Sequence, residues 1–484
     1  MTQGMEANAR RGLRRVAPSL LVTVVLLGLG LYSQRPLALA LAVYVCLCLV
    51  PVTLQMWRGR LDLLRLDVLI TAGFFLYGFP DAVDLMWLGN VRQLPEGPAT
   101  VAMVLQIAWL AAFLGGYYGL GGRLRRRGEE ALEASKTVLL PPWIPLGIMA
   151  LGVAMFLAYT ASFGGPVAYL MDFSRLQRFG MSEGKGYLSL GFLILCSAWI
   201  IHLANSLLAA QQRGQPREIT RVLIMHGIGL IPFSLFVFAA GDRRPWLFLV
   251  IGLLYVTMKF VRIKPAPLIF GGLALAVLLQ LFMYVRDFST APTAAKAYVG
   301  KHFSLTWLNP TIGELGWPFD TLTHLVRIMP ERGYSYGGTY LVGLINVMPL
   351  GLFPDRPLVP GLWYAKEFFP ARFAAGGSLA FSFVGEAFMN FGVLGPPVVG
   401  LLAAVVVLWW ERVGRRWRAQ ALGMAWTGSA LLLFMELPRA DFASVFKGLL
   451  FATVFPIMLA QGIEMLARRR SASDRREAGD QVAL

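Results

Sequence analysis

Apolar runs of roughly twenty residues, the length of a helix that crosses a membrane, recur along almost the whole of this 484-residue chain. Lipid offers backbone N–H and C=O groups no hydrogen-bond partners, so each continuous run is expected to form a helix rather than an open strand. Hydrophobic residues make up 57% of the chain and charged residues only 15%, and the mean hydropathy is +0.61. The sequence therefore predicts an all-α polytopic membrane protein.

About twelve transmembrane helices are expected from that length requirement. Their predicted positions are 17–34, 37–56, 66–80, 99–120, 142–162, 187–209, 222–240, 246–261, 268–285, 391–410, 420–437 and 443–466. We expect residues 1–466 to form a single transmembrane domain. The polar and charged residues 467–484 are expected to form a disordered cytoplasmic tail.

The net charge of +17 could indicate a nucleic-acid partner, but its distribution indicates a membrane topology instead. Arginine clusters at 10–15, 123–127, 412–418 and 468–470 all fall on one side of the predicted topology. Positive residues accumulate on the cytoplasmic side of membrane proteins, so both termini are expected in the cytoplasm. The basic runs are short, flank the spans and lack interleaved aromatic residues. We therefore expect no nucleic-acid partner.

One long connection stands out among short ones. Residues 286–383 separate the ninth and tenth expected spans and lie on the outer face in this topology. Functional residues are often carried on loops that a rigid scaffold positions, which makes this loop the candidate functional region. Within it, residues 340–353 are apolar but too few to cross a membrane comfortably. An interfacial or re-entrant helix is expected there.

Several common kinds of site are missing from the sequence. Cys46, Cys48 and Cys196 are the only cysteines, and all three lie within expected spans, so neither a disulfide framework nor a cysteine metal site is expected. The chain has no HExxH motif, no Walker-type glycine loop and no nucleophile elbow. We therefore expect no metal, no cofactor and no bound ATP, and a substrate that brings its own activated bond.

Arginines on the outer side of the predicted topology are candidate ligands for an anionic substrate. Arg243 and Arg244 occupy a short turn, Gly-Asp-Arg-Arg-Pro, between the seventh and eighth spans. A guanidinium fork binds phosphate bidentately and keeps its charge, so this pair suits a pyrophosphate head group. Arg175 and Arg178 are three residues apart and could share a helix face as a second clamp. The further candidates are Arg286, Arg356 and Arg439.

A structural role remains open for each of these arginines. The pair in the turn could extend into solvent or pair with Asp242. The three single arginines could each serve packing or ion pairing rather than substrate binding.

Glu386 is the candidate general base. It lies in an otherwise apolar segment at the entry to the tenth span, where an unpaired carboxylate is costly. A carboxylate in such surroundings can accept a proton from a hydroxyl group. The alternative is that Glu386 pairs with an outer arginine and serves packing alone. Asp355 and His324, both in the long loop, are the reserve candidates.

The second half of the chain contains a series of short motifs. In order, they are Gly-Tyr-Ser-Tyr-Gly-Gly-Thr-Tyr at 333–340, Met-Pro at 348–349, Phe-Pro-Asp-Arg-Pro at 353–357 and a Gly-Glu…Asn-Phe-Gly segment at 385–392. Together with the arginine turn, this order resembles the bacterial oligosaccharide repeat-unit polymerases, the Wzy or O-antigen polymerase family. The resemblance runs from about residue 160 onward. Leu350 stands where a basic residue would be expected, so Arg356 is taken as its substitute.

That resemblance implies a metal-independent, inverting glycosyltransferase with a GT-C-like helical fold. Its substrates would be polyprenyl-pyrophosphate-linked glycans, joined among membrane lipids on the outer, periplasmic face of the bacterial inner membrane. The arginines would stabilise the departing pyrophosphate, and a carboxylate would help to deprotonate the acceptor hydroxyl. A chain-length regulator would be a further partner.

Two other functions fit the same sequence. A glycan ligase of the same architecture would move a finished glycan to a different acceptor, and the sequence does not separate it from a polymerase. A flippase or other transporter of lipid-linked oligosaccharides would also suit twelve spans. Its buried ionisable residues, however, should gather near the membrane midplane rather than at the outer rim.

Overall fold

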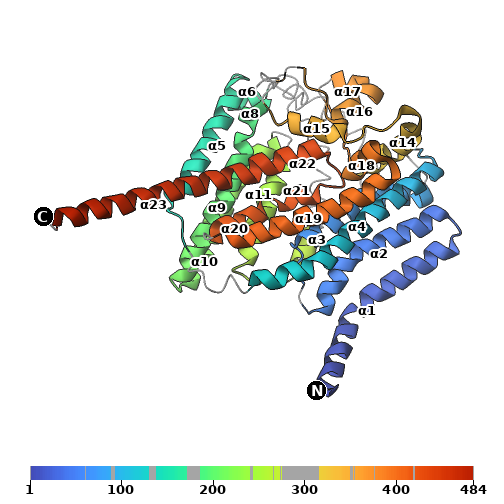
Figure 1. Cartoon of the computed structure of the whole chain (residues 1–484), viewed down its shortest axis with the longest axis horizontal. Coiled ribbons are helices and arrows are strands. Elements are labelled where there is room, and N and C mark those ends of the chain that lie inside the picture. The colour runs from blue at the N-terminus through green and yellow to red at the C-terminus, as the bar shows by residue number, and fades with distance from the viewer. Residues whose placement is uncertain are drawn as a thin grey trace.

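The computed structural model describes residues 2–59, 61–88, 93–129, 138–171, 186–239, 244–264, 266–272, 274, 315–348, 353, 355–374, 377–417 and 420–482. Side chains are described for the same residues except 2–15, 122–129, 171, 186 and 471–482. All regular secondary structure in these parts of the chain is helical (Figure 1). The predicted all-α fold is therefore confirmed for the described residues.

Long helices form the body of the molecule. They are α1 (Thr2–Tyr32), α2 (Pro36–Trp57), α3 (Leu66–Val83) with its π-helical continuation η1 (Asp84–Leu88), α4 (Glu96–Glu129), α5 (Trp143–Ala161), α9 (Gly191–Gln212), α10 (Pro216–Ala239), α11 (Arg244–Met258), α19 (Gly395–Arg416) and α23 (Phe455–Val482). The shorter helices α20 (Gln420–Gly428), α21 (Leu431–Met435), α22 (Phe442–Gly448) and η4 (Leu449–Val454) lie between α19 and α23.

A second set of short helices connects the long ones. It comprises α6 (Pro166–Met171), α8 (Gly186–Ser189), α14 (Trp317–Arg332), α15 (Gly338–Ile345), α16 (Pro360–Phe368), α17 (Pro370–Ala374), α18 (Phe383–Phe391) and η3 (Gly392–Leu394). In Figure 1, α14 to α18 gather at one end of the bundle, drawn at the upper right. That end therefore carries the described part of the long loop.

Eight helices of the described residues are long and apolar enough to cross a membrane, and each coincides with an expected span. Three shorter apolar helices, Val16–Tyr32, Arg244–Met258 and Gln420–Met435, coincide with three more. The remaining expected span, 268–285, lies mostly outside the described residues. The multi-pass architecture is thus confirmed, whereas the total of twelve stays a prediction.

Two local predictions can be compared with the structure. The segment expected to form a short interfacial or re-entrant helix, 340–353, overlaps α15, which has only eight residues and is too short to cross a membrane. The tail for which disorder was predicted continues α23 as far as Val482.

Close packing between α4 and α19 holds the centre of the bundle. A Cβ atom added at Gly400 of α19 would overlap the carbonyl oxygen of Trp109 on α4, so only glycine permits this approach. Trp109 is itself fully buried and stacks between Phe74 and Phe113, with ring centroids 4.6 and 5.4 Å apart respectively. Small residues at such crossings let helix backbones approach closely. In lipid no hydrophobic force drives helices together, so the association depends on this close packing.

We predict that Gly400→Ala lowers the thermal stability of the purified protein, because the added methyl group forces α4 and α19 apart. Overpacking of this kind typically costs about 1–3 kcal/mol. Gly119→Ala on α4 is the matched control, since nothing lies within 4 Å of its added Cβ. Thermal unfolding in detergent should show a lower midpoint for the first variant only. Equal midpoints would mean that the crossing can adjust to the methyl group.

Candidate functional site

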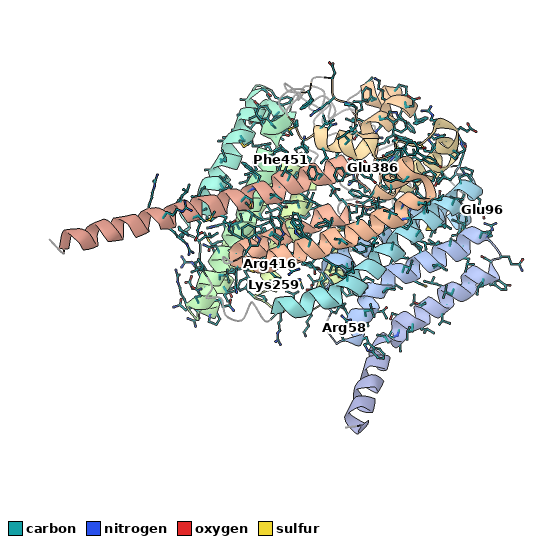
Figure 2. All side chains as sticks on the ribbon, in the orientation of Figure 1. Arg58, Glu96, Lys259, Glu386, Arg416 and Phe451 are labelled. Atoms are coloured by element: carbon teal, nitrogen blue, oxygen red, sulfur yellow. The ribbon has the colours of Figure 1, made fainter. Side chains whose placement is uncertain are left out.

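Glu386 ties three separate helices together at the end of the bundle that carries the long loop (Figure 2). Its side chain on α18 is fully buried. One carboxylate oxygen accepts a hydrogen bond of 2.7 Å from the Thr339 hydroxyl on α15, and the other accepts one of 2.6 Å from the Phe442 backbone N–H on α22. The expected burial is therefore present, and both carboxylate oxygens are hydrogen-bonded within the protein.

Asn390, one turn further along α18, extends this tie to the backbone of the 333–340 motif. Its side-chain NH₂ group donates a hydrogen bond of 2.6 Å to the Thr339 hydroxyl oxygen, and its side-chain oxygen accepts a hydrogen bond of 2.9 Å from the Gly337 N–H. The backbone adds two bonds of 3.0 Å, from Ser335 to the Met389 carbonyl and from Tyr336 to the Asn390 carbonyl. The two sequence motifs at 333–340 and 385–392 are thus one hydrogen-bonded unit.

The backbone conformation of the 333–340 motif requires glycine at the start of α15. Gly337 has φ 89° at the start of α15, a left-handed conformation that side chains rarely adopt. Tyr336, just before it, is also left-handed at φ 45° and leaves its ring 81% exposed. Non-glycine residues in this region are uncommon and cost energy, so they often mark functional positions.

Asp441 starts α22 and joins it to α16. One of its carboxylate oxygens accepts a 2.8 Å bond from the Ser444 N–H, as an N-cap residue does, and the other accepts a 3.3 Å bond from the Gly361 N–H. A side chain at Gly361 would meet the Leu379 carbonyl oxygen and Asp441. The segment that precedes α22 is therefore fixed against the loop helices.

Two predicted arginines meet on a carboxylate that the sequence did not single out. Arg244, the first residue of α11, lies 2.7 Å from a Glu436 oxygen, and Arg439 lies 3.8 Å from the other. The Glu436 side chain is only 7% exposed, whereas those of Arg244 and Arg439 are 42% and 27% exposed. The Arg439 guanidinium also lies 5.8 Å from the centre of the Tyr77 ring. The two guanidinium groups face partly outward.

The remaining described candidates have different surroundings. Arg356 donates bonds of 3.2 and 3.1 Å to the carbonyls of Asn346 and Met348, which caps the end of α15. This contact favours a structural role for Arg356. Asp355, its neighbour, is exposed.

His324 on α14 is hydrogen-bonded through Nδ1 to the Tyr364 hydroxyl at 2.7 Å. Burial, followed by the nearby charges of Arg327 and Arg332, lowers the pKa of His324 below its usual value. The ring therefore stays neutral at neutral pH and keeps the ability to accept a proton.

Four predicted arginines lie outside the described residues: Arg175, Arg178, Arg243 and Arg286. Among the residues that are described, no group of three or more His, Cys, Asp or Glu side chains could hold a metal ion.

A cavity of about 370 Å³ adjoins the hydrogen-bonded unit. Its lining residues are Met329, Arg332, Gly333, Ser335, Trp363 and Met389. Ser335 and Met389 are also joined to each other in that unit, so the cavity shares a wall with the segment that Glu386 holds. Arg332 forms a 2.9 Å ion pair with Glu367.

Sequence reasoning missed Glu436, Asp441 and Thr339. For Glu436 a signal was present, because a carboxylate near the end of an expected span is unusual. Its partners are remote in the chain, and no local pattern indicates that pairing. Thr339 and Asp441 carry ordinary polar side chains whose importance follows only from their contacts.

Comparison with known proteins agrees with the motifs. No curated protein and no solved structure matches the chain. The family model described as O-antigen polysaccharide polymerase Wzy matches residues 220–469, which include α11, the loop helices and the Glu436 segment. This match covers just over half of the chain, and the protein therefore belongs to the O-antigen polysaccharide polymerase Wzy family.

Proposed function

We propose that this protein joins polyprenyl-pyrophosphate-linked repeat units on the outer face of the bacterial inner membrane by metal-independent, inverting glycosyl transfer. The acceptor hydroxyl oxygen attacks the anomeric carbon of the donor sugar. The bond from that carbon to the pyrophosphate oxygen breaks, and its electron pair leaves with the pyrophosphate. The hydroxyl proton passes to a base.

The observation that carries this proposal is the convergence of Arg244 and Arg439 on Glu436. The shared carboxylate holds two guanidinium groups in place before any substrate arrives. Preorganised donors of this kind stabilise charge as it develops on a leaving group, without reorganisation during the reaction. Their forks match the geometry of phosphate oxygens, so a departing pyrophosphate is the ligand that fits best.

The orientation of α19 supports a reaction on the outer face. This helix has 22 residues, from Gly395 to Arg416, and is therefore about 33 Å long at 1.5 Å per residue. Glu386 precedes its first residue, whereas the basic residues Arg415 and Arg416 end it, and Figure 2 draws Glu386 and Arg416 at opposite ends. Because basic clusters favour the cytoplasmic side, the Glu386 end is expected to face outward.

The same end of the bundle offers a place for a sugar ring. The cavity beside Ser335 and Met389 is lined by Trp363 and Arg332, which combine an aromatic face with hydrogen-bond donors. Such a mixture of apolar wall and a few polar groups is typical of small-ligand sites. We assign this cavity to a sugar of the repeat unit.

We propose a positioning role for Glu386 rather than the general-base role that the sequence suggested. Its two oxygens are already occupied by the Thr339 hydroxyl and the Phe442 N–H, and it has no exposed surface. A general base must come within hydrogen-bond reach of the substrate proton. His324 and Asp355 remain candidates for the general base that accepts that proton.

We predict that Arg244→Ala and Arg439→Ala each slow polymerisation by roughly 10² to 10³ fold, as removal of one preorganised donor does elsewhere. Arg244→Lys should be almost as damaging, because an ammonium group cannot reproduce the fork. The measurement is the polymer ladder that purified protein forms from a lipid-linked repeat unit. Arg221→Ala is the control, since Arg221 lies on α10 beside Glu218, outside the proposed site.

Normal polymer length in both alanine variants would remove these residues from the site. The same assay tests the finer points. Chelators should leave the rate unchanged, and the new linkage should have the inverted configuration. A wild-type product on an acceptor other than the polyprenyl carrier would indicate a ligase. Trapping of repeat units on the cytoplasmic leaflet in a knockout would indicate a transporter.

Glu386→Gln and Thr339→Val separate the two roles of the buried carboxylate. For a positioning residue, both variants should lower thermal stability and activity together, because each disrupts the same bond between α15 and α18. If Glu386 is a general base, Glu386→Gln should lower the rate roughly 10²- to 10⁴-fold without changing the thermal stability. Thr339→Val should then keep most of the activity. We expect the first pattern, measured by unfolding midpoints and initial rates.

Trp363→Ala is predicted to raise the KM for the lipid-linked repeat unit roughly three- to tenfold, the scale of one aromatic contact. The turnover number should change little, because Trp363 would bind a sugar ring without taking part in bond breaking. Trp363→Phe should retain most affinity. Trp143→Ala, an exposed aromatic residue at the start of α5, is the control. An unchanged KM in Trp363→Ala would place the sugar elsewhere.

A further inference from the structure

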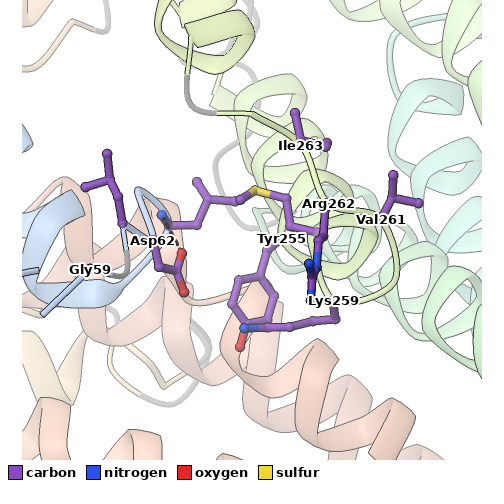
Figure 3. A pocket seen from close by; sticks show the side chains of 10 residues that line it. Gly59, Asp62, Tyr255, Lys259, Val261, Arg262 and Ile263 are labelled. Atoms are coloured by element: carbon purple, nitrogen blue, oxygen red, sulfur yellow. Dashed lines mark hydrogen bonds between the residues drawn. The ribbon is translucent and has the colours of Figure 1, made fainter. Parts of the chain in front are cut away.

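A second cavity, of about 460 Å³, lies at the other end of α11 from Arg244 (Figure 3). It is formed where the connection between α2 and α3 meets the residues that follow α11. The lining residues are Gly59, Leu61, Asp62, Leu64, Tyr255, Met258, Lys259, Val261, Arg262 and Ile263. Neither the sequence motifs nor the proposed reaction uses it.

Two cations line this cavity without a carboxylate within ion-pair distance among the described residues. They are Lys259 and Arg262. The Lys259 ammonium lies 4.5 Å from the centre of the Tyr255 ring, a contact that holds the side chain but leaves its charge uncompensated. The one acidic lining residue, Asp62, accepts a 3.0 Å bond from the Leu64 N–H. The cavity therefore has an excess of positive charge.

The walls of the cavity combine these charges with apolar side chains. Leu61, Leu64, Met258 and Ile263 all contribute to the lining. A hydrogen bond of 2.7 Å from the Asp62 backbone N–H to the Gln55 side-chain oxygen on α2 fixes the position of the Asp62 backbone. A ligand that fits must carry negative charge at one point and carbon atoms close beside it.

The position of the cavity indicates the membrane boundary. Tyr255 belongs to the last turn of the apolar helix α11, and Lys259 follows the end of that helix. Figure 2 draws both Lys259 and Arg416 on the side of the bundle away from Glu386. Under the positive-inside rule this side faces the cytoplasm. Lipid head groups are the anions present at that depth in high concentration.

We propose that this cavity binds the phosphate group of an anionic phospholipid from the cytoplasmic leaflet, between Lys259 and Arg262. The guanidinium of Arg262 can take two phosphate oxygens, and Lys259 adds a point charge. The apolar walls contact the glycerol and the first acyl carbons. Such a lipid joins the α2–α3 connection to the end of α11 and stabilises the bundle at the end remote from the reaction.

The test is lipid retention by the purified full-length protein in native mass spectrometry, with phosphatidylglycerol and phosphatidylcholine offered at equal concentration. Wild type should retain phosphatidylglycerol preferentially. Lys259→Gln combined with Arg262→Gln should weaken that binding roughly tenfold or more, given the contribution of each basic residue near a charged surface. Arg217→Gln combined with Arg221→Gln on α10 is the control, because it removes the same charge outside the cavity.

Lys259→Arg keeps the charge and should keep the lipid, so it serves where the double glutamine variant fails to fold. Equal loss of lipid in the control pair would overturn the proposal, since binding would then follow surface charge alone. Equal retention of phosphatidylcholine by wild type would also overturn it. If inorganic phosphate raised the unfolding midpoint as much as phosphatidylglycerol does, the cavity would be a site for free phosphate and the lipid proposal would be overturned.

Discussion

A buried carboxylate fixes the frame on which the candidate site depends. Glu386 is fully enclosed, and a polar group removed from water is tolerated only where hydrogen bonds replace the lost hydration. The Thr339 hydroxyl and the Phe442 N–H supply those bonds from two other helices. Helices α15, α18 and α22 therefore cannot separate without leaving the carboxyl oxygens of Glu386 without hydrogen-bond partners.

This frame is continuous with the centre of the bundle. Gly395, the first residue of α19, lies against the carbonyl of Ala387 on α18, and Gly400 lets α19 approach α4. Arg244 and Arg439 are attached to the same end through Glu436. Their guanidinium groups remain partly exposed, at the start of α11 and in the connection between α21 and α22.

Much of the fold was predictable from the sequence, because hydropathy acts locally. A run of apolar residues must bury its backbone polar groups in a helix wherever lipid surrounds it, and eight of the expected spans appear as long apolar helices. The site was predictable only in part. Glu386 was selected because a carboxylate in apolar surroundings is costly. Arg244 and Arg439 were selected because they fall on the outer side of the predicted topology, where a guanidinium group suits an anionic substrate.

The sequence by itself determined the helical membrane architecture, the family and the identity of several charged candidates. Only the tertiary structure decided their partners: Arg244 and Arg439 meet on Glu436, and Glu386 is closed off by Thr339 and Phe442. The reason is that an isolated charge is recognisable from its own neighbours along the chain, whereas its partner is set by helix packing over long sequence separations. For that reason we propose a positioning role for Glu386 in place of the general-base role that the sequence suggested.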